Sequence, residues 1–472
     1  MKPQRKLQKT AGALIALAAA GAAALLWFAV TYTVPTPAAA PSRAMLLGMW
    51  GVLYVADAPA PWILSTAIAV AFLLIAGIAL ADRRISLKSR RSANPTQPLA
   101  PRIVMARTRG VYAGPVTLTV LIPAHNEAAS LPLTLASLLA QSQPPERIIV
   151  VADNCTDATA GVARAAGVEV LETERNSQKK AGALNQALKR LLPGQGDNDL
   201  VMVMDADTLL DDGFLASAVE YFTRDRALMA VGGLFYGEPG HGLLGQFQRN
   251  EYIRYARDMR RRRGRVFVLT GTASVFRPAA LRTVAENRGT ALPGVAGDVY
   301  DTWALTEDNE LTIALKSLGG LMVSPPECAV VTELMPTWRT LWAQRLRWQR
   351  GALENLGAYG LTPPTARYWA QQFGLGYGVI ALSSYLLLIL LTVLALDTWI
   401  WFPFWLGLGA LFSFERMVTV WHGGWRARLL ALTVVPELLF DMFLNVVYVK
   451  GIIDMSVGRE ASWKHLAKAG RA

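Results

Sequence analysis

The chain of 472 residues is 53% hydrophobic and only 17% charged, a balance that indicates membrane-spanning segments within it. Its 47 Lys and Arg outnumber 35 Asp and Glu, for a net charge of +12, and in a membrane protein this surplus indicates cytoplasmic loops beside an anionic leaflet before it indicates nucleic acid. Two Cys and four His are too few for a disulfide framework or a Cys-rich zinc site, so we assign no transition-metal site.

Two apolar runs begin the chain. The first, residues 11–30, follows four basic residues and fits a bilayer span better than a signal peptide, although three Ala at 38–40 leave cleavage as the less favoured alternative. The second, residues 61–81, precedes a basic stretch. Because the basic flanks lie at the outer ends of both predicted helices, those ends face the cytoplasm. We therefore expect a transmembrane hairpin over residues 1–81, followed by a cytoplasmic linker over residues 82–113.

From residue 116 the pattern predicts strands alternating with helices. In order, the predicted elements cover residues 116–122, 131–139, 147–152, 168–171, 179–192 and 200–204. Such alternation is typical of a mostly parallel, nucleotide-binding sheet. The first strand is followed by neither a Walker-type phosphate loop nor a Gly-x-Gly-x-x-Gly turn, which weakens the ATPase and dinucleotide interpretations. Phosphate binding would therefore rest on a metal ion and on basic side chains.

The strand predicted over residues 200–204 ends in two carboxylates one residue apart, Asp205 and Asp207. In α/β sheets, ligands gather at the carboxyl ends of the strands. Two Asp side chains there can hold a hard divalent cation such as Mg²⁺, which in turn binds phosphate oxygens. Asp is also common in turns, so the pair alone is equally consistent with a strand that ends in a polar turn.

A run of Arg covers residues 260–263, with further Arg at 257 and 265. Nucleic-acid binding is one interpretation. A solvated or membrane-facing basic helix is favoured, because the segment belongs to a cytoplasmic domain held at the bilayer.

The segment Thr306-Glu307-Asp308 leads into an apolar-periodic helix over residues 311–318. Thr306 is a good N-cap, and acidic residues in the first turn complement the helix dipole. Asp308 can also serve as a general base that takes a proton from an attacking hydroxyl beside a metal-bound phosphate. The two interpretations are compatible.

Residues 338–351 combine Trp and Arg at helical spacing. An amphipathic helix at the membrane surface explains the pattern, with Trp at the headgroup level and Arg snorkelling. The Arg side chains can also bind a departing diphosphate, and Trp348 offers a flat face for a sugar ring. A helix at the membrane surface could also close an active site.

Three further apolar segments cover residues 372–396, 398–414 and 429–449. Three full spans would export a basic C-terminal tail, against the positive-inside bias, so one segment is expected to be re-entrant or interfacial. Glu437 and Asp441 share one face of the last predicted helix. Because carboxylates at membrane depth are costly, we expect them to face protein, either as a buried structural pair or along a path for a growing glycan.

Six motifs carry a family resemblance: Ile122-Pro123-Ala124-His125-Asn126-Glu127, Asp153-Asn154-Cys155-Thr156-Asp157, Lys180-Ala181-Gly182-Ala183-Leu184-Asn185, Asp205-Ala206-Asp207, Thr306-Glu307-Asp308 and Gln344-Arg345-Leu346-Arg347-Trp348. Their order resembles that of membrane-embedded family 2 glycosyltransferases. The processive synthases of poly-N-acetylglucosamine, chitin, hyaluronan and cellulose look most similar. The resemblance covers residues 116–351. It implies an α/β GT-A (Rossmann-like) catalytic domain on the cytoplasmic side, flanked by transmembrane helices, and an inverting transfer from a UDP-sugar.

The resemblance also implies roles for individual residues. Asp308 would deprotonate the acceptor hydroxyl, and Asp207 would ligate Mg²⁺ or Mn²⁺. Asp153 would contact uracil, and Lys180 the uridine diphosphate. The whole set on the donor side comprises Pro123, Glu127, Asp153, Lys180, Asp205, Gln344, Arg345 and Arg347. On the acceptor side Trp348 would stack on the terminal sugar, together with Glu307 and the weaker loop match Gly271 and Thr272.

We therefore expect a glycosyltransferase domain at 114–336, a membrane-interface segment at 337–371 and a C-terminal transmembrane region at 372–472. The expected enzyme transfers a sugar, with UDP-N-acetylglucosamine favoured as donor, to a growing β-linked polysaccharide. It would lie in the bacterial inner membrane, with a glycan acceptor, the lipid bilayer and an export subunit as partners. The alternatives are a non-processive glycosyltransferase with a lipid acceptor and, less favoured, a non-catalytic scaffold that binds nucleotide sugars.

Overall fold

The computed structural model describes residues 42–46, 50–54, 87–109, 114–262, 264–394, 399–401 and 403–459, with six isolated positions between 69 and 84. The predicted span at 11–30 and most of that at 61–81 lie outside these residues. The chain divides into two compact units, one containing Leu87–Arg367 and the other containing Tyr368–Gly458 together with the described residues before 87.

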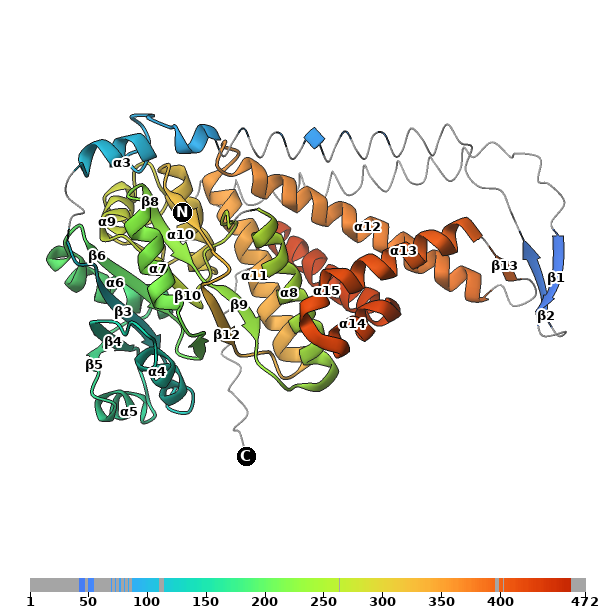
Figure 1. Cartoon of the computed structure of the whole chain (residues 1–472), viewed down its shortest axis with the longest axis horizontal. Coiled ribbons are helices and arrows are strands. Elements are labelled where there is room, and N and C mark those ends of the chain that lie inside the picture. The colour runs from blue at the N-terminus through green and yellow to red at the C-terminus, as the bar shows by residue number, and fades with distance from the viewer. Residues whose placement is uncertain are drawn as a thin grey trace. The chain divides into compact units, whose positions relative to one another are not determined.

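The first unit is built on a seven-stranded mixed sheet with the order β11-β8-β10-β6-β3-β4-β5, which helices flank (Figure 1). Strands β3, β4, β5 and β6 are parallel, as predicted, and β10 runs antiparallel between β6 and β8. The sheet strands are β3 (Thr117–Ala124), β4 (Arg147–Ala152), β5 (Glu169–Glu172), β6 (Asp199–Met204), β8 (Leu228–Gly232), β10 (Ala273–Phe276) and β11 (Leu321–Val323). A second sheet, of order β7-β12-β9, combines β7 (Thr208–Leu210), β9 (Leu234–Gly237) and β12 (Ala329–Thr332).

The helices of this unit connect the strands and carry most of the motifs. They are α3 (Pro101–Arg107), α4 (Leu131–Leu139), α5 (Thr159–Ala165), α6 (Lys179–Leu191), α7 (Phe214–Arg224), α8 (Gly242–Arg261), α9 (Pro278–Asn287), α10 (Glu307–Ser317) and α11 (Trp338–Tyr359), with a short 3-10 turn η1 (Leu192–Gly194). The segment expected as a linker thus contains α3, whose neighbour Leu99 is buried and donates its N–H to Leu318 O.

Strand β3 continues to Ala124, two residues beyond its predicted end at Ile122. The pairing with β6 stops at Leu121, whereas pairing with β4 continues to Ala124. Pro123 therefore lies beyond the β6 ladder, where its missing N–H removes no hydrogen bond between strands.

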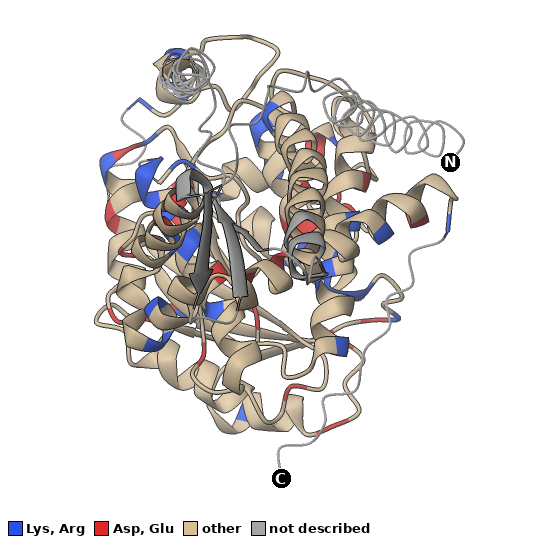
Figure 2. Cartoon of the chain, turned by 90° about the vertical axis from the view of Figure 1, so that its right-hand side faces the viewer, with Lys and Arg blue, Asp and Glu red and all other residues tan. Residues whose placement is uncertain are grey.

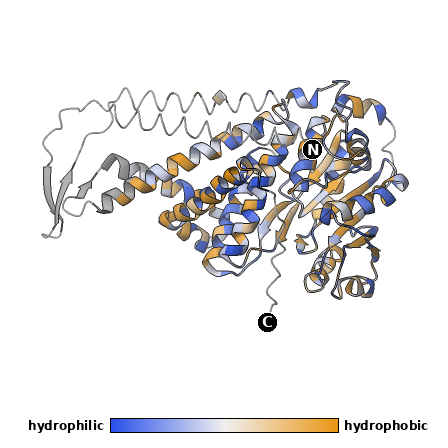
Figure 3. Cartoon of the chain, turned by 180° about the vertical axis from the view of Figure 1, so that it is seen from behind, coloured by the Kyte–Doolittle hydropathy of each residue, from blue (hydrophilic) through white to orange (hydrophobic). Residues whose placement is uncertain are grey.

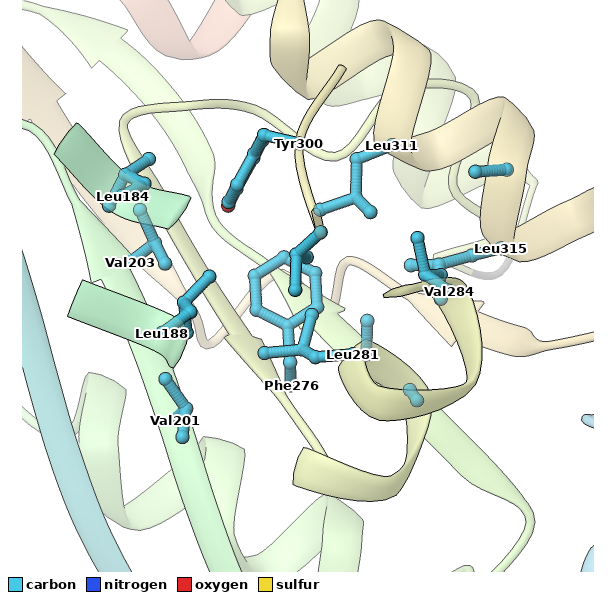
Figure 4. Packing of buried hydrophobic residues seen from close by; sticks show 14 of the residues in the cluster. Leu184, Leu188, Val201, Val203, Phe276, Leu281, Val284, Tyr300, Leu311 and Leu315 are labelled. Atoms are coloured by element: carbon cyan, nitrogen blue, oxygen red, sulfur yellow. The ribbon is translucent and has the colours of Figure 1, made fainter. Parts of the chain in front are cut away.

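Both faces of the central strands are buried, as expected for parallel strands covered by helices. On one face Val201 and Val203 pack against Leu184 and Leu188 of α6 and Phe276 of β10, with residues of α9 and α10 beside them (Figure 4). On the other face, Leu200, Met202 and Met204 pack with residues of α4 and α7. This burial fixes the carboxyl end of β6, where Asp205 follows.

Arg260 and Arg261 of the predicted Arg run end α8, and Arg262 is its C-cap residue. Arg262 is paired with Asp258 over 2.8 Å, and acidic residues lie among the basic ones on the face shown in Figure 2. The solvated or membrane-facing basic helix that the sequence favoured over a nucleic-acid site stays a prediction.

The second unit is mostly helical, and hydrophobic residues run along its helices (Figure 3). Its elements are β1 (Ser42–Leu46), β2 (Trp50–Tyr54), α12 (Ala366–Leu394), β13 (Trp399–Trp401), α13 (Pro403–Thr419), η2 (Trp421–Gly423), α14 (Gly424–Thr433) and α15 (Val435–Ser456). Strand β2 pairs with β1 and with β13. The segment predicted at 398–414 is therefore divided between β13 and α13.

The last apolar segment is broken rather than continuous. Val434, at a φ of +55°, separates α14 from α15, and the chain bends by 83° there. Among the described residues, only this bent pair has the length and apolar composition to cross a membrane, and no single helix does. The expectation that one of the three segments is re-entrant or interfacial stays a prediction.

Glu437 and Asp441 both bind Arg416 of α13. The guanidinium lies 2.9 Å from Glu437 Oε2 and 2.8 Å from Asp441 Oδ2. The two carboxylates therefore share one face of α15, as predicted, and hold α13 through a single cation.

Candidate active site

Lys180 joins two carboxylates from distant parts of the sequence. Its Nζ atom lies 2.6 Å from Asp205 Oδ1 and 3.1 Å from Glu307 Oε1. Lys180 is the second residue of α6, Asp205 follows β6, and Glu307 begins α10. All three side chains are less than one-third exposed. The sheet thus brings together three of the residues that the motifs singled out.

Gly271 places a third carboxylate, Asp308, beside this cluster. Antiparallel pairing of β10 with β6 sets Ala273 opposite Met204, so the residues before β10 lie beside those after β6. Accordingly, Asp205 N donates to Thr272 O over 3.1 Å, and Gly271 N donates to Asp308 Oδ2 over 3.1 Å. The loop Gly271-Thr272 therefore belongs to the site.

The charges of the cluster set the protonation of Asp308. Burial and the charge of Glu307 raise the pKa of Asp308 to about 6, although Lys180 acts in the opposite direction. Burial would also raise the pKa of Glu307, but Lys180 and Arg347 outweigh it and hold that pKa below its ordinary value. Asp308 is thus the carboxylate whose pKa lies near neutrality, where a general base is most effective.

Tyr300 lies behind the cluster and was not identified from the sequence. It lines a cavity of about 10 Å³ together with Lys180, Glu307 and Asp308. That volume is about what one water molecule requires. Asn185, the last residue of the Lys180 motif, fixes the backbone of Tyr300: its Oδ1 accepts from Tyr300 N over 2.9 Å and its Nδ2 donates to Tyr300 O over 2.9 Å.

Two Arg residues of α11 that the motif groups together have different surroundings. Arg347 interacts electrostatically with Glu307 and with Lys179, which places its charge at the cluster. Arg345 is buried and forms an ion pair with Glu251 of α8 over 2.9 Å. Residues two apart in a helix point to opposite sides, which explains the divergence.

The other residues of the same motif surround Arg345. Gln344 Oε1 accepts from Arg345 over 3.2 Å, and the Arg345 guanidinium lies 4.3 Å from the centre of the Trp348 ring. One face of Trp348 is therefore occupied by a cation. These partners hold the Arg345 side chain between α8 and Trp348, and the diphosphate contact that the resemblance implied stays a prediction.

Asp153, Pro123 and Glu127 lie at the carboxyl ends of β3 and β4. Asp153 Oδ1 accepts from Thr173 Oγ1 and from Asn176 Nδ2, each over 2.8 Å. Glu127 Oε2 accepts from Ser130 Oγ over 2.6 Å. These contacts fix the loops beside the site, and the contacts described for these carboxylates do not include Lys180 or Asp308.

Asp207 stands on the turn after β6, two residues beyond Asp205. In the described part of the chain, no group of three or more His, Cys, Asp or Glu side chains could by itself hold a metal ion. Mg²⁺ is commonly held by one or two carboxylates and completed by water and substrate phosphates. The metal-binding role that the resemblance implies for Asp207 stays a prediction.

Residues 119–285 match the model of glycosyl transferase family 2. The chain carries a family 2 glycosyltransferase domain. Among curated relatives, the poly-beta-1,6-N-acetyl-D-glucosamine synthase of Staphylococcus aureus (strain COL) is 28% identical over 246 residues, and that of Staphylococcus epidermidis is 27% identical over 252 residues. Each match covers 51% of this chain and 55% of the relative, so the chain spans about half the length of the relatives that it matches.

Solved structures are also similar to parts of this chain. A mannosyltransferase from Pyrobaculum calidifontis in complex with GDP-Man and Mn²⁺ is 17% identical, with a TM-score of 0.48, over 81% of this chain and 99% of that one. Glucosyl-3-phosphoglycerate synthase from Mycobacterium tuberculosis, in complex with Mn²⁺, UDP and phosphoglyceric acid, is 18% identical, with a TM-score of 0.35, over 57% and 85%. With TM-scores below 0.5, the assignment of the glycosyltransferase domain rests on the sequence match.

Proposed function

We propose that this glycosyltransferase is a membrane-associated polysaccharide synthase that uses a UDP-sugar. The observation that carries the proposal is the position of Asp308, which Gly271 holds beside the Lys180–Glu307 ion pair. The curated relatives support UDP-N-acetylglucosamine as the donor and a β-linked polymer of N-acetylglucosamine as the product, because both are named as synthases of that polymer.

In the proposed reaction, Asp308 takes the proton of the acceptor hydroxyl while the hydroxyl oxygen attacks the anomeric carbon of the donor sugar. The bond between that carbon and the diphosphate oxygen breaks, and its electron pair leaves with UDP. Attack from the face opposite the diphosphate inverts the anomeric configuration. The reaction needs one base on the acceptor side and positive charge on the diphosphate side.

Positive charge on the donor side comes from Lys180 and Arg347. Guanidinium and ammonium groups bind phosphate oxygens strongly where water is excluded. When bound at Asp207, Mg²⁺ or Mn²⁺ supplies further positive charge that stabilises the diphosphate leaving group. Asp205 holds Lys180 in place at 2.6 Å, and Trp348 offers the face of its ring away from Arg345 to the acceptor sugar.

The apolar surface of the second unit supports a membrane location. Several large hydrophobic side chains are exposed there, among them Tyr377, Leu411 and Leu439, each more than half exposed. Soluble monomers rarely expose large contiguous apolar patches, whereas a lipid-facing surface consists of them. We propose that a bilayer covers α12, α13 and α15, and, separately, that the glycosyltransferase domain faces the cytoplasm, where UDP-sugars are made.

The size of the product separates this proposal from the alternatives. Membranes that contain the full chain would be incubated with radiolabelled UDP-N-acetylglucosamine and Mg²⁺, and the labelled product sized after lipid extraction. We expect a large product that stays in the aqueous phase. A single sugar on an extractable lipid would instead establish the non-processive alternative. Binding of UDP without any labelled product would favour the scaffold.

A further inference from the structure

One stripe of α11 contacts the beginning of α10. Arg347, Gly351, Asn355 and Tyr359 are spaced four residues apart and therefore lie along one side of the helix. Each of them meets the segment 306–310, which contains Asp308. The stripe thus connects the helix of the Gln-Arg-Leu-Arg-Trp motif to the segment that bears the proposed base.

Gly351 and Asn355, at the centre of the stripe, both lie against Thr306. Asn355 Nδ2 donates to Thr306 O and to Thr306 Oγ1, each over 3.2 Å. Gly351 allows the approach, because a Cβ atom at this position would lie 2.5 Å from Thr306 Oγ1. Thr306 is the N-cap residue of α10, as predicted, but its side chain makes no cap hydrogen bond and instead accepts from Asn355.

The two ends of the stripe meet charged residues of α10. Tyr359 donates to Glu310 Oε1 over 2.5 Å, and Glu310 is also bound by Arg288 over 2.5 and 2.7 Å. Glu310 and Arg288 are almost fully buried. At the other end, Arg347 interacts with Glu307. These contacts attach α11 to the start of α10 at fixed points. They therefore determine where Arg347 lies relative to Glu307 and Asp308.

We propose that Gly351, Asn355 and Tyr359 are positioning residues that fix Arg347 relative to Asp308. The inference rests on the proposed function, in which Arg347 faces the leaving diphosphate and Asp308 the attacking hydroxyl. Neither Asn355 nor Tyr359 touches the reacting atoms. They hold Arg347 on the donor side and Asp308 on the acceptor side as one rigid unit. A displacement of about 1 Å between such groups costs on the order of a hundredfold in rate.

The test compares Asn355→Leu with Gln141→Leu in the full chain. Gln141 is a matched control: it is a buried amide that donates to Asp211 O over 2.9 Å and accepts from Leu215 N over 3.2 Å, on the opposite face of the sheet from α10. Asn355→Leu loses two hydrogen bonds and Gln141→Leu loses three, so both variants should lower the unfolding midpoint. We expect only Asn355→Leu to lower kcat for UDP release, by about 10- to 100-fold, and to shift the acidic limb of the pH profile.

Three further variants keep the test independent of folding. Thr306→Val removes the Oγ1 acceptor at nearly constant volume and should reproduce part of the loss in kcat, whereas Thr306→Ser keeps the acceptor and should restore it. Tyr359→Phe removes only the hydroxyl. Equal kcat in wild type, Asn355→Leu and Thr306→Val, at temperatures where all are folded, would overturn the proposal and leave the stripe as core packing.

Hydrogen exchange separates failure of this inference from failure of the proposed function. We expect Asn355→Leu, but not Gln141→Leu, to speed amide exchange in residues 306–310. If wild type releases no UDP from any donor, the proposed function fails, while faster exchange in this segment still supports the positioning contacts. Unchanged exchange in Asn355→Leu would overturn them in either case.

Discussion

The backbone N–H of Gly271 donates to Oδ2 of Asp308 over 3.1 Å. A loop that precedes β10 thereby holds a carboxylate at the first turn of α10, and the second oxygen of that carboxylate accepts from Asn309 N over 2.7 Å. Two backbone donors fix the orientation of Asp308 without neutralising its charge. An oriented and partly buried carboxylate is what a general base requires.

Asp308→Asn tests this role directly. The amide can still accept from Gly271, so the local structure should remain, but it cannot take a proton. We expect turnover to fall by about 10²- to 10⁴-fold, while UDP binding changes little. The measurements are UDP release and calorimetric titration with UDP. Turnover within tenfold of wild type would show that another group takes the proton.

The pH profile should have an acidic limb set by Asp308. Burial and Glu307 raise the pKa of this carboxyl to about 6, and the base acts only when deprotonated, so kcat/KM should rise with pH and be half-maximal near pH 6. The titratable groups around Asp308 are Glu307, Lys180, Asp205, Tyr255 and Tyr300.

A Lys180 variant tests the direction in which Lys180 shifts the pKa of Asp308. Lys180 lowers the pKa of Asp308, so any turnover left in Lys180→Met should have its acidic limb at higher pH than in wild type. A limb near pH 4 in wild type would contradict the assignment of Asp308.

Gly271→Ala should disturb the cluster without unfolding the domain. A Cβ atom there would lie 3.0 Å from Lys180 Nζ and 3.6 Å from both Asp205 Oδ2 and Asp308 Oδ2. Because Lys180 must shift away from its two carboxylates, we expect turnover to fall by about tenfold or more. Gly161→Ala in α5, where no atom lies within 4 Å of the new Cβ, is the control and should keep full turnover. Equal activities of the two variants would refute the prediction.

Removal of divalent cations should abolish turnover. We expect EDTA to stop UDP release and Mn²⁺ or Mg²⁺ to restore it, and we expect Asp207→Asn to require about tenfold more metal for half-maximal rate. Asp212→Asn, which changes an exposed carboxylate five residues further on, should behave as wild type. Full turnover in EDTA would contradict this part of the proposal.

The sequence predicted those parts of the fold that local patterns determine. Strand β4 has the predicted bounds, because an apolar run follows Arg147 directly and ends at Asp153. Strand β10 was not predicted, since it has four residues and exists through its pairing with β6 and β8. Helix α11 is eight residues longer than the predicted 338–351, because its second half is held by contacts with α10 that only the tertiary structure creates.

For the candidate site, too, the sequence predicted what local motifs determine and not what tertiary contacts determine. The motifs predicted Lys180, Asp205, Glu307 and Asp308, which lie together. A motif does not state which side of a helix faces the site, and Arg345 was therefore grouped with Arg347, although its ion pair is with Glu251. Neither Tyr300 nor Asn355 belongs to a functional pattern, because their importance comes from contacts with residues more than forty positions away.

UDP release by the detergent-solubilised full chain, measured over a panel of UDP-sugars with Mg²⁺ or Mn²⁺, tests the central claim most directly. The proposed mechanism predicts that one UDP-sugar, UDP-N-acetylglucosamine, supports metal-dependent release and that Asp308→Asn abolishes it. No release from any UDP-sugar, in detergent and in native membranes alike, would contradict the claim that this chain is a UDP-sugar-dependent synthase.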